Sequence, residues 1–191
     1  MPHTQTLNLD KKTRIKHLLV VAGAGRNVGK TDSICRLIRH FSGIYSIYAL
    51  KVSAIYPDET LYHGDHSDDT YGGVLFEEKR TDSSKDTSKM LLSGAQKVFY
   101  LRGDGTEIQQ GFEEFMKKSQ DADLIICESN SLHEYVTPGM HVLIASSDKA
   151  MKPRARLIVD KVDLILYSSE ATKSVDCSSI KYSVSKGWHT I

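Results

Sequence analysis

The ten residues "AGAGRNVGKT", at positions 22–31, decide the fold of this chain. They follow the apolar run 15–22, which is typical of a strand buried on both faces of a sheet. They precede residues 31–41, in which apolar residues recur at helical spacing from Ile34 to Phe41. The segment therefore predicts a strand, a glycine-rich loop and a helix in succession. In this context a Gly-Lys-Thr triplet is typical of a phosphate-binding loop.

Each residue type in the loop has a physical task in binding phosphate. Glycines let successive backbone N–H groups turn toward an anion, and the start of the helix adds unpaired N–H groups and positive potential. Lys30 is expected to contact the terminal phosphates, and the Thr31 hydroxyl is expected to ligate magnesium. The Arg26 side chain either reaches a phosphate or another subunit's ligand, or remains a solvated loop residue. The expected phosphate cradle consists of Gly25, Arg26, Asn27, Val28 and Gly29.

The loop departs from the usual pattern at one position. The pattern places its first glycine five residues before Gly29, where this chain has Ala24 between Gly23 and Gly25. That glycine usually permits a backbone conformation that costs ~1–2 kcal/mol for a residue with a Cβ. We therefore expect phosphate binding to survive, with a slightly altered loop geometry.

The rest of the chain alternates between predicted strands and helices. Helices are expected at 82–96 and 106–119. Such alternation predicts an α/β fold of the P-loop NTPase type, with a mostly parallel sheet and helices on both faces. The chain of 191 residues suits a single domain, 1–191, with a candidate loop insertion at 54–80. Further strands are expected at 45–53, 74–80, 97–103, 122–129, 140–147, 162–168 and, as a last edge strand, 180–185.

The candidate insertion contains a group of histidines and aspartates. Such residues can bind a divalent metal, but their spacing in a loop fixes no coordination geometry. A solvated acidic loop is the favoured interpretation, with a role as a lid or a partner-binding element as an alternative. The residues are His63, Asp65, His66, Asp68 and Asp69.

A second carboxylate is expected close to the loop. Phosphoryl chemistry normally uses a carboxylate on a neighbouring strand to complete the magnesium shell or to orient a water molecule. Glu128 ends the apolar run "LIICE", and ligands of open α/β sheets bind at the carboxyl ends of the strands. We therefore predict Lys30 and Glu128 as catalytic residues, and Thr31 and Glu128 as the metal-binding pair. The alternative is a strand-end glutamate that faces solvent.

These elements together resemble the molybdopterin-guanine dinucleotide biosynthesis protein B family, in order and rough spacing over residues 15–170. The second strand, "YALKVS", carries Lys51, the stretch "DTSKMLLSGA" begins at Asp86, and "LIICES" supplies Glu128. The resemblance implies that Lys51 and Asp86 approach the nucleotide, and Lys89 the active site. The alternative for Asp86 and Lys89 is a capping aspartate and an exposed lysine on the predicted helix. It also implies that the nucleotide is GTP and the cofactor Mg²⁺. The implied role is that of an accessory protein that acts with a partner protein in molybdopterin-guanine dinucleotide biosynthesis, and the implied assembly is a homodimer.

The chain also differs from the pattern of that family. Asp32 replaces a second threonine after the lysine, Met90 replaces a histidine, and Ser129 replaces the glycine after the strand glutamate. The nucleotide-binding residues therefore match the family better than the residues for a client substrate do. Hydrolysis is expected to be slow, because no catalytic glutamine or arginine finger is evident beyond Arg26.

Two other functions are compatible with the same residues. One is an ATP-dependent small-molecule kinase or ligase of the dethiobiotin synthetase type, with its substrate beside Lys51 and Glu128. The other is a module that binds a nucleotide without turning it over. The sequence lacks the guanine-specific N-K-x-D motif, so that the choice between GTP and ATP stays open. Asp148, which follows the predicted strand 140–147, is a candidate acceptor for the edge of a guanine base.

Composition and charge give no support to nucleic-acid or membrane partners. The formal net charge is +1, which provides no strongly basic surface. No apolar run approaches the ~18–20 residues that span a bilayer, and residues 1–16 lack the apolar core of a signal peptide. The three cysteines include no C-x-x-C pair and fit a reducing compartment. We therefore expect a cytoplasmic protein.

Overall fold

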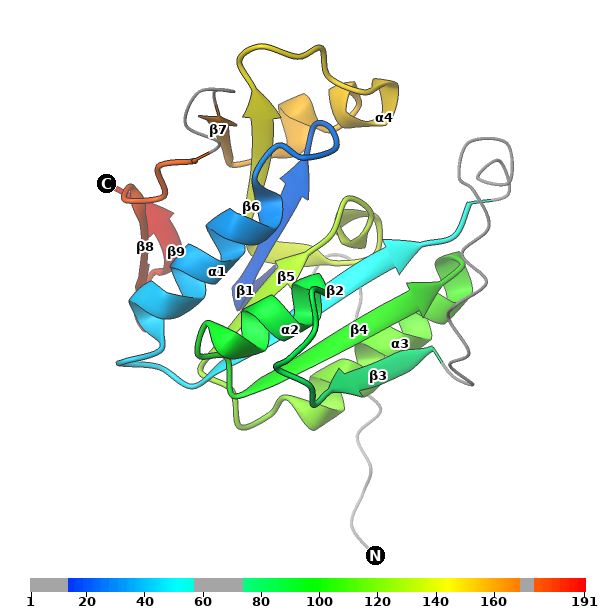
Figure 1. The fold of residues 1–191 in the computed structure, drawn as a ribbon, viewed down its shortest axis with the longest axis vertical. Helices are drawn as coiled ribbons and strands as arrows, with labels where there is room; N and C mark the ends of the chain where they lie inside the picture. The colour runs from blue at the N-terminus through cyan, green and yellow to red at the C-terminus, as the bar shows by residue number, and fades with distance from the viewer. Residues whose placement is uncertain (1–13, 57–73, 169–173) are drawn as a thin grey trace, which may run out of the picture.

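The computed structural model describes residues 14–56, 74–168 and 174–191 (Figure 1). A seven-stranded sheet with the strand order β3-β4-β2-β5-β1-β6-β7 forms its centre. All neighbouring strands are parallel except β3, which pairs with β4 in the antiparallel direction. The predicted α/β fold with a mostly parallel sheet is confirmed, and its layout is consistent with the P-loop NTPase type. The strands are β1 (Arg14–Gly23), β2 (Ile47–Ala54), β3 (Leu75–Glu78), β4 (Lys97–Gly103), β5 (Leu124–Glu128), β6 (Thr137–Ser146) and β7 (Leu164–Ser168).

The middle strands are apolar because both faces of the sheet are covered. Every residue of β5 is buried, and so are all residues of β1 from Leu18 to Gly23. A strand buried on both faces reads as a continuous apolar run rather than as an alternating one. This explains why residues 15–22 and 124–127 were recognisable in the sequence.

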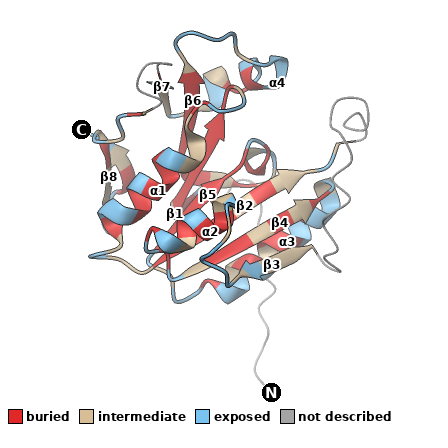
Figure 2. Cartoon of the chain, in the orientation of Figure 1, coloured by how far each residue is buried: buried red, intermediate tan, exposed pale blue. Residues whose placement is uncertain are grey.

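Helices cover both faces of the sheet, as predicted (Figure 1). Helices α1 (Lys30–Phe41) and α2 (Asp86–Leu92) lie on one face, where Ile34 and Met90 belong to the same apolar cluster. Helix α3 (Gly105–Lys118) covers the other face and buries Phe112 and Phe115 there. Figure 2 shows that α1 is buried along the side facing the sheet and exposed on its outer side. Packing of the apolar face of α1 against the sheet holds the first turn of this helix in place, and it thereby also positions the loop that precedes α1.

Five short elements complete the described chain. The short helix α4 (Pro153–Arg156) follows β6, and its Ala155 packs in a small third apolar cluster. The 3₁₀ turns η2 (Leu132–Glu134) and η3 (Val159–Lys161) connect β5 to β6 and α4 to β7. At the carboxyl end of the chain, β8 (Ile180–Ser183) and β9 (Gly187–Thr190) form a separate antiparallel pair.

Two predictions of local structure are wrong. The helix expected over 82–96 is confined to α2, and the chain leaves it through Gly94, whose φ of 107° lies in the left-handed region that suits glycine. The segment 180–185 is not an edge strand of the main sheet, because β8 pairs with β9 instead. No strand was predicted at the position of β9. Trp188 of β9 is a packing residue, as its indole N–H donates to the His17 carbonyl over 3.0 Å.

The described residues contain no helix that is both long and apolar enough to cross a membrane. Residues 57–73 lie outside the described parts of the chain, and with them most of the candidate insertion at 54–80. The group from His63 to Asp69 belongs to that segment.

Candidate functional site

The candidate nucleotide site lies at the carboxyl ends of β1, β2 and β5. Strands β2 and β5 are hydrogen-bonded neighbours in the middle of the sheet, and Lys51 on β2 lies opposite Glu128 on β5 in their register. A pocket of about 460 Å³ opens there, beside the start of α1. Most of the predicted residues line this pocket. The lining consists of Arg26, Asn27, Val28, Gly29, Lys30, Thr31, Asp32, Lys51, Asp86, Lys89 and Glu128.

The loop turns into α1 through two residues with left-handed backbone conformations. Asn27 has a φ of 55°, and Gly29 has a φ of 90° and forms the N-cap of α1. Asparagine and glycine are the residues that adopt this conformation most readily. Gly29 also accepts two hydrogen bonds at its carbonyl, from the Ser33 amide at 2.9 Å and the Ser33 hydroxyl at 2.8 Å. The turn therefore points the first amides of a twelve-residue helix at the pocket.

The expected strain at Ala24 is absent, and that prediction is corrected. Among the described non-glycine residues only Asn27 has a positive φ, so Ala24 does not need the freedom of a glycine. Its amide donates to the Ile144 carbonyl at 2.8 Å, and its carbonyl accepts from the Lys152 amide at 2.9 Å. Its methyl group is buried in the small cluster that includes Ala155. Ala24 thus extends β1 along β6 and fits its place without strain.

Gly23 has a specific steric role instead. A Cβ at this position would lie 2.5 Å from Cδ and 2.6 Å from Nζ of Lys30. The lysine side chain therefore passes directly over the Gly23 backbone. The Gly23 amide donates to Oδ1 of Asn130 over 2.8 Å, which holds the end of β1 against the segment after β5. Asn130 is not among the residues predicted for the site. Its polar side chain two residues after Glu128 was the available signal.

Lys30 is half-buried and lies among opposite and like charges. Burial lowers the pKa of its ammonium group, while the charge of Glu128 raises it and the charge of Lys51 lowers it again. The charge of Lys152, which belongs to the basic run 152–156, lowers the pKa of Lys30 further. Nζ lies 3.4 Å from the Gly25 carbonyl. The cation is thus held over the loop, where a bound anion would relieve the like-charge repulsion.

Thr31 and Glu128 form a direct contact between α1 and β5. The Thr31 hydroxyl donates to Oε2 of Glu128 over 3.0 Å, and Glu128 is 7% exposed. A hydroxyl and a carboxylate are hard oxygen ligands of the kind that Mg²⁺ prefers, and Mg²⁺ usually takes only one or two protein ligands together with phosphates and water. These two residues fit that donor set. The alternative of a solvent-facing strand-end glutamate is wrong.

Lys51 and Asp86 form a half-buried ion pair in the lining of the pocket. Burial acts against charge on both residues, yet the pKa of Lys51 is raised by Glu128 and Asp86, and the pKa of Asp86 is lowered by its hydrogen bond to Lys51. Lys89 adds a second ion pair to Asp86 at 3.3 Å. The charge of Glu128 therefore acts on both Lys30 and Lys51, and the pocket lining as a whole contains four cationic side chains and three carboxylates.

Two predicted residues fall outside the pocket lining. Gly25 contributes its carbonyl to Lys30 but does not line the pocket. Asp148 follows β6, where its amide donates to the Ser146 hydroxyl at 3.2 Å, and it does not belong to the described lining. Arg26 lines the pocket from the exposed part of the loop. The described residues hold no cluster of three or more potential metal ligands.

Comparison of the sequence with known proteins returned no matching family model and no matching curated protein.

Proposed function

We propose that this protein binds a nucleoside triphosphate with Mg²⁺ in the pocket at the start of α1 and hydrolyses it slowly. The observation that carries this proposal is the convergence of Lys30, Thr31 and Glu128 at a glycine-capped helix start. Each of the three meets a different requirement of a site for phosphates and magnesium: Lys30 supplies a cation, Thr31 a hydroxyl and Glu128 a carboxylate.

The roles follow from the positions of the groups. The amides from Gly25 to Gly29 cradle the phosphates, and Lys30 contacts the β- and γ-phosphates. Thr31 and Glu128 hold the magnesium ion, which supplies charge neutralisation at the phosphate oxygens when bound. Glu128 also orients water toward the terminal phosphate. Lys51 adds a second cation to the lining of the pocket.

Slow turnover is expected from the residues around the pocket. The described lining contains no glutamine that could orient an attacking water, and Arg26 is its one arginine. A preference for GTP, an accessory role in molybdopterin-guanine dinucleotide biosynthesis, a partner protein of that pathway and a homodimer are supported by the sequence resemblance alone.

A second candidate function is a small-molecule kinase or ligase that uses the same nucleotide. A second cavity of about 390 Å³ favours this candidate, because it shares Lys51 and Asp86 with the phosphate pocket. Turnover would then depend on a second substrate in that cavity.

Isothermal titration calorimetry of the full chain with magnesium-GTP and magnesium-ATP, each repeated in the presence of EDTA, tests the proposal. We expect micromolar affinity for a triphosphate that depends on magnesium, with GTP bound more tightly than ATP, and slow phosphate release. Tighter binding of ATP would favour the kinase or ligase. Binding of neither nucleotide would refute the proposal.

A further inference from the structure

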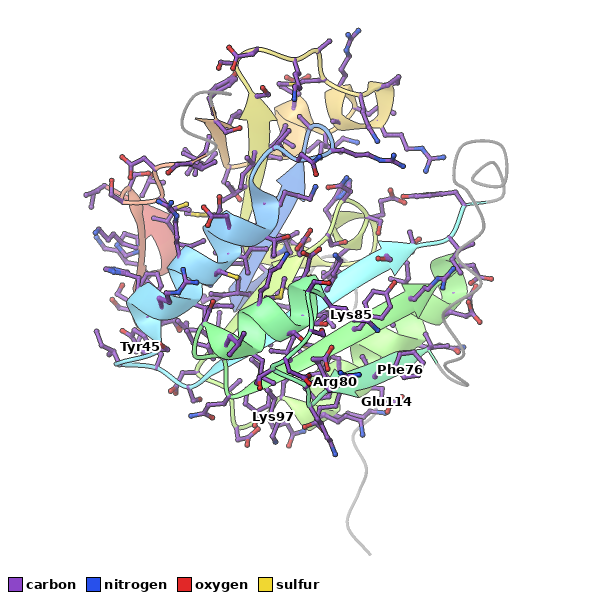
Figure 3. The ribbon with its side chains drawn as sticks, viewed as in Figure 1. Tyr45, Phe76, Arg80, Lys85, Lys97 and Glu114 are labelled. Carbon is purple, nitrogen blue, oxygen red and sulfur yellow. The ribbon has the colours of Figure 1, made fainter. Side chains whose placement is uncertain are left out.

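The second cavity lies on the side of the sheet that carries α2, at the edge formed by β3. Lys51 and Asp86 line both this cavity and the pocket beside the start of α1, which is called the phosphate pocket. Figure 3 shows Phe76 on β3 and Lys85 at the beginning of α2, on the face of the molecule turned to the viewer. The complete described lining is Lys51, Ser53, Phe76, Glu77, Glu78, Ser84, Lys85, Asp86, Thr87 and Tyr100.

A row of side chains across the sheet connects the two cavities. Phe76 is the register partner of Tyr100, Tyr100 is the partner of Lys51, and Lys51 is the partner of Glu128. Register partners on neighbouring strands point to the same face of a sheet. With strands about 4.8 Å apart, the row from Phe76 to Glu128 spans about 14 Å. Phe76 on the edge strand and Tyr100 on the next strand therefore lie in one row with Lys51 and Glu128 of the phosphate pocket.

The carboxylates Asp86 and Glu78 in the second cavity already have partners, one an ion pair and the other neutral hydrogen bonds. Asp86 is paired with Lys51, and Glu78 accepts hydrogen bonds from the Thr87 hydroxyl at 2.8 Å and from the Arg80 amide at 2.9 Å. The lining as a whole contains two lysines and three carboxylates, which leaves no strong excess of either sign. A charged ligand would gain little here, whereas hydroxyls of Ser53, Ser84 and Tyr100 offer neutral hydrogen-bonding groups.

We infer that this cavity binds an uncharged, planar heteroaromatic compound whose ring packs on Phe76 and Tyr100 and whose polar end lies beside Lys51 and Asp86. Phe76 and Tyr100 supply two adjacent aromatic surfaces, on which planar rings of different identity can stack. The volume suits a ligand of one or two rings. The role of this compound as a second substrate rests on the proposed nucleotide site, whereas its binding does not.

The test uses the full chain and three small probes in ligand-observed NMR titrations near neutral pH. Two probes, hydroxymethylpyridine and hydroxymethylbenzimidazole, carry a planar ring and a hydroxyl. The third, tetrahydropyranylmethanol, has a similar size and hydroxyl but no planar ring. The variants are Tyr100→Leu and Phe76→Leu. The control is Tyr167→Leu, since Tyr167 is 58% exposed on β7 at the opposite edge of the sheet.

We expect both ring probes to bind the unmodified protein and to lose about tenfold in affinity in Tyr100→Leu and in Phe76→Leu. The Tyr167→Leu control should bind them unchanged, and the saturated probe should not bind. Two results would overturn the inference: absence of ring-probe binding, or ring-probe affinities that do not change in Tyr100→Leu although it unfolds at the same temperature as the unmodified protein.

Calorimetry with magnesium-GTP on the same preparations separates this inference from the proposed function. Nucleotide binding without ring-probe binding would remove the second site and leave the nucleotide site. Ring-probe binding that is sensitive to Tyr100→Leu, without nucleotide binding, would retain the second site and remove the proposed function.

Discussion

The Thr31 hydroxyl donates a hydrogen bond of 3.0 Å to the buried carboxylate of Glu128. This contact joins the start of α1 to the carboxyl end of β5, and it lies beside Lys30 in the same pocket. Two hard oxygen groups held this close would both serve a magnesium ion that also binds phosphates.

Removal of the Thr31 hydroxyl should therefore weaken nucleotide binding mainly when magnesium is present. We expect Thr31→Ala to lower the affinity for magnesium-GTP about tenfold or more, because a ligand of the ion is lost, and to change binding in EDTA little. Thr31→Ser keeps the hydroxyl and should retain most of the affinity. Calorimetry with and without magnesium measures both effects. An equal loss in the two conditions would show that Thr31 does not act through the metal.

Gly23→Ala should impair the site without greatly affecting the fold. The added Cβ would meet Cδ and Nζ of Lys30 at 2.5 and 2.6 Å, and the flexible lysine would move away. We expect about a tenfold loss of triphosphate affinity with a small change in unfolding temperature. The matched control is Gly43→Ala, because a Cβ there meets no atom within 4 Å. A Gly23→Ala protein that binds as tightly as the control would contradict the assigned position of Lys30.

Ala24→Gly should restore the usual loop pattern but make the protein less stable. The methyl group of Ala24 is buried and its φ is not positive, so a glycine gains nothing there. Loss of a buried methyl group and the added freedom of the unfolded chain together predict a decrease of about 1–2 kcal/mol in the free energy of unfolding. Denaturant titration measures this change. A clear increase in triphosphate affinity would indicate that Ala24 does distort the loop.

Residues 22–31 illustrate how far the sequence could predict the site. Lys30, Thr31 and Glu128 were assigned correctly to one pocket because the loop and the strand end are local patterns. Gly23 and Asn130 were not assigned to the site, because their roles depend on three-dimensional contacts. The Lys30 side chain crosses the Gly23 backbone, and the Gly23 N–H donates to the side-chain oxygen of Asn130. The cost expected at Ala24 was wrong for the same reason: a spacing pattern does not give φ.

The fold was predictable to a similar extent. Buried parallel strands such as β5 have continuous apolar runs that identify them. The hairpin of β8 and β9 has a local signal, a short connection over residues 184–186 before Gly187, which the prediction of one strand at 180–185 missed. Its place beside β1 depends on distant contacts, including the hydrogen bond from Trp188 to His17. The alignment of Phe76 with Tyr100 and Lys51 likewise depends on the antiparallel register between β3 and β4, which the sequence does not specify.

A buried histidine outside the site should make stability depend on pH. His141 on β6 is buried, and its ring stacks on His133 with centroids 5.1 Å apart. Burial, assisted by the charge of His133, lowers the pKa of His141 from 6.5 to about 4, against the opposing effect of Asp163. The unfolded chain therefore binds this proton more readily than the folded chain. Stability from this residue is complete above pH 6.5 and is lost as the pH falls toward 4.

The shift corresponds to about 3 kcal/mol of unfolding free energy between those two pH values. Denaturant titrations at a series of pH values should show this decrease in the unmodified protein. The variant His141→Phe cannot titrate and should flatten the dependence, whereas His40→Gln, at an exposed position on α1, should leave it as it is. An unchanged pH dependence in His141→Phe would assign it to other groups.

The most direct test of the nucleotide site is the affinity of Lys30→Ala for magnesium-GTP and magnesium-ATP, measured by calorimetry beside the control Lys161→Ala. Lys161 lies in η3, outside the described lining of the pocket. A lysine bonded to phosphate contributes a charge-assisted interaction, so we predict a loss of about 10- to 100-fold in Lys30→Ala and no change in Lys161→Ala. Equal affinities in the two variants would show that the loop at residues 22–31 does not bind nucleotide.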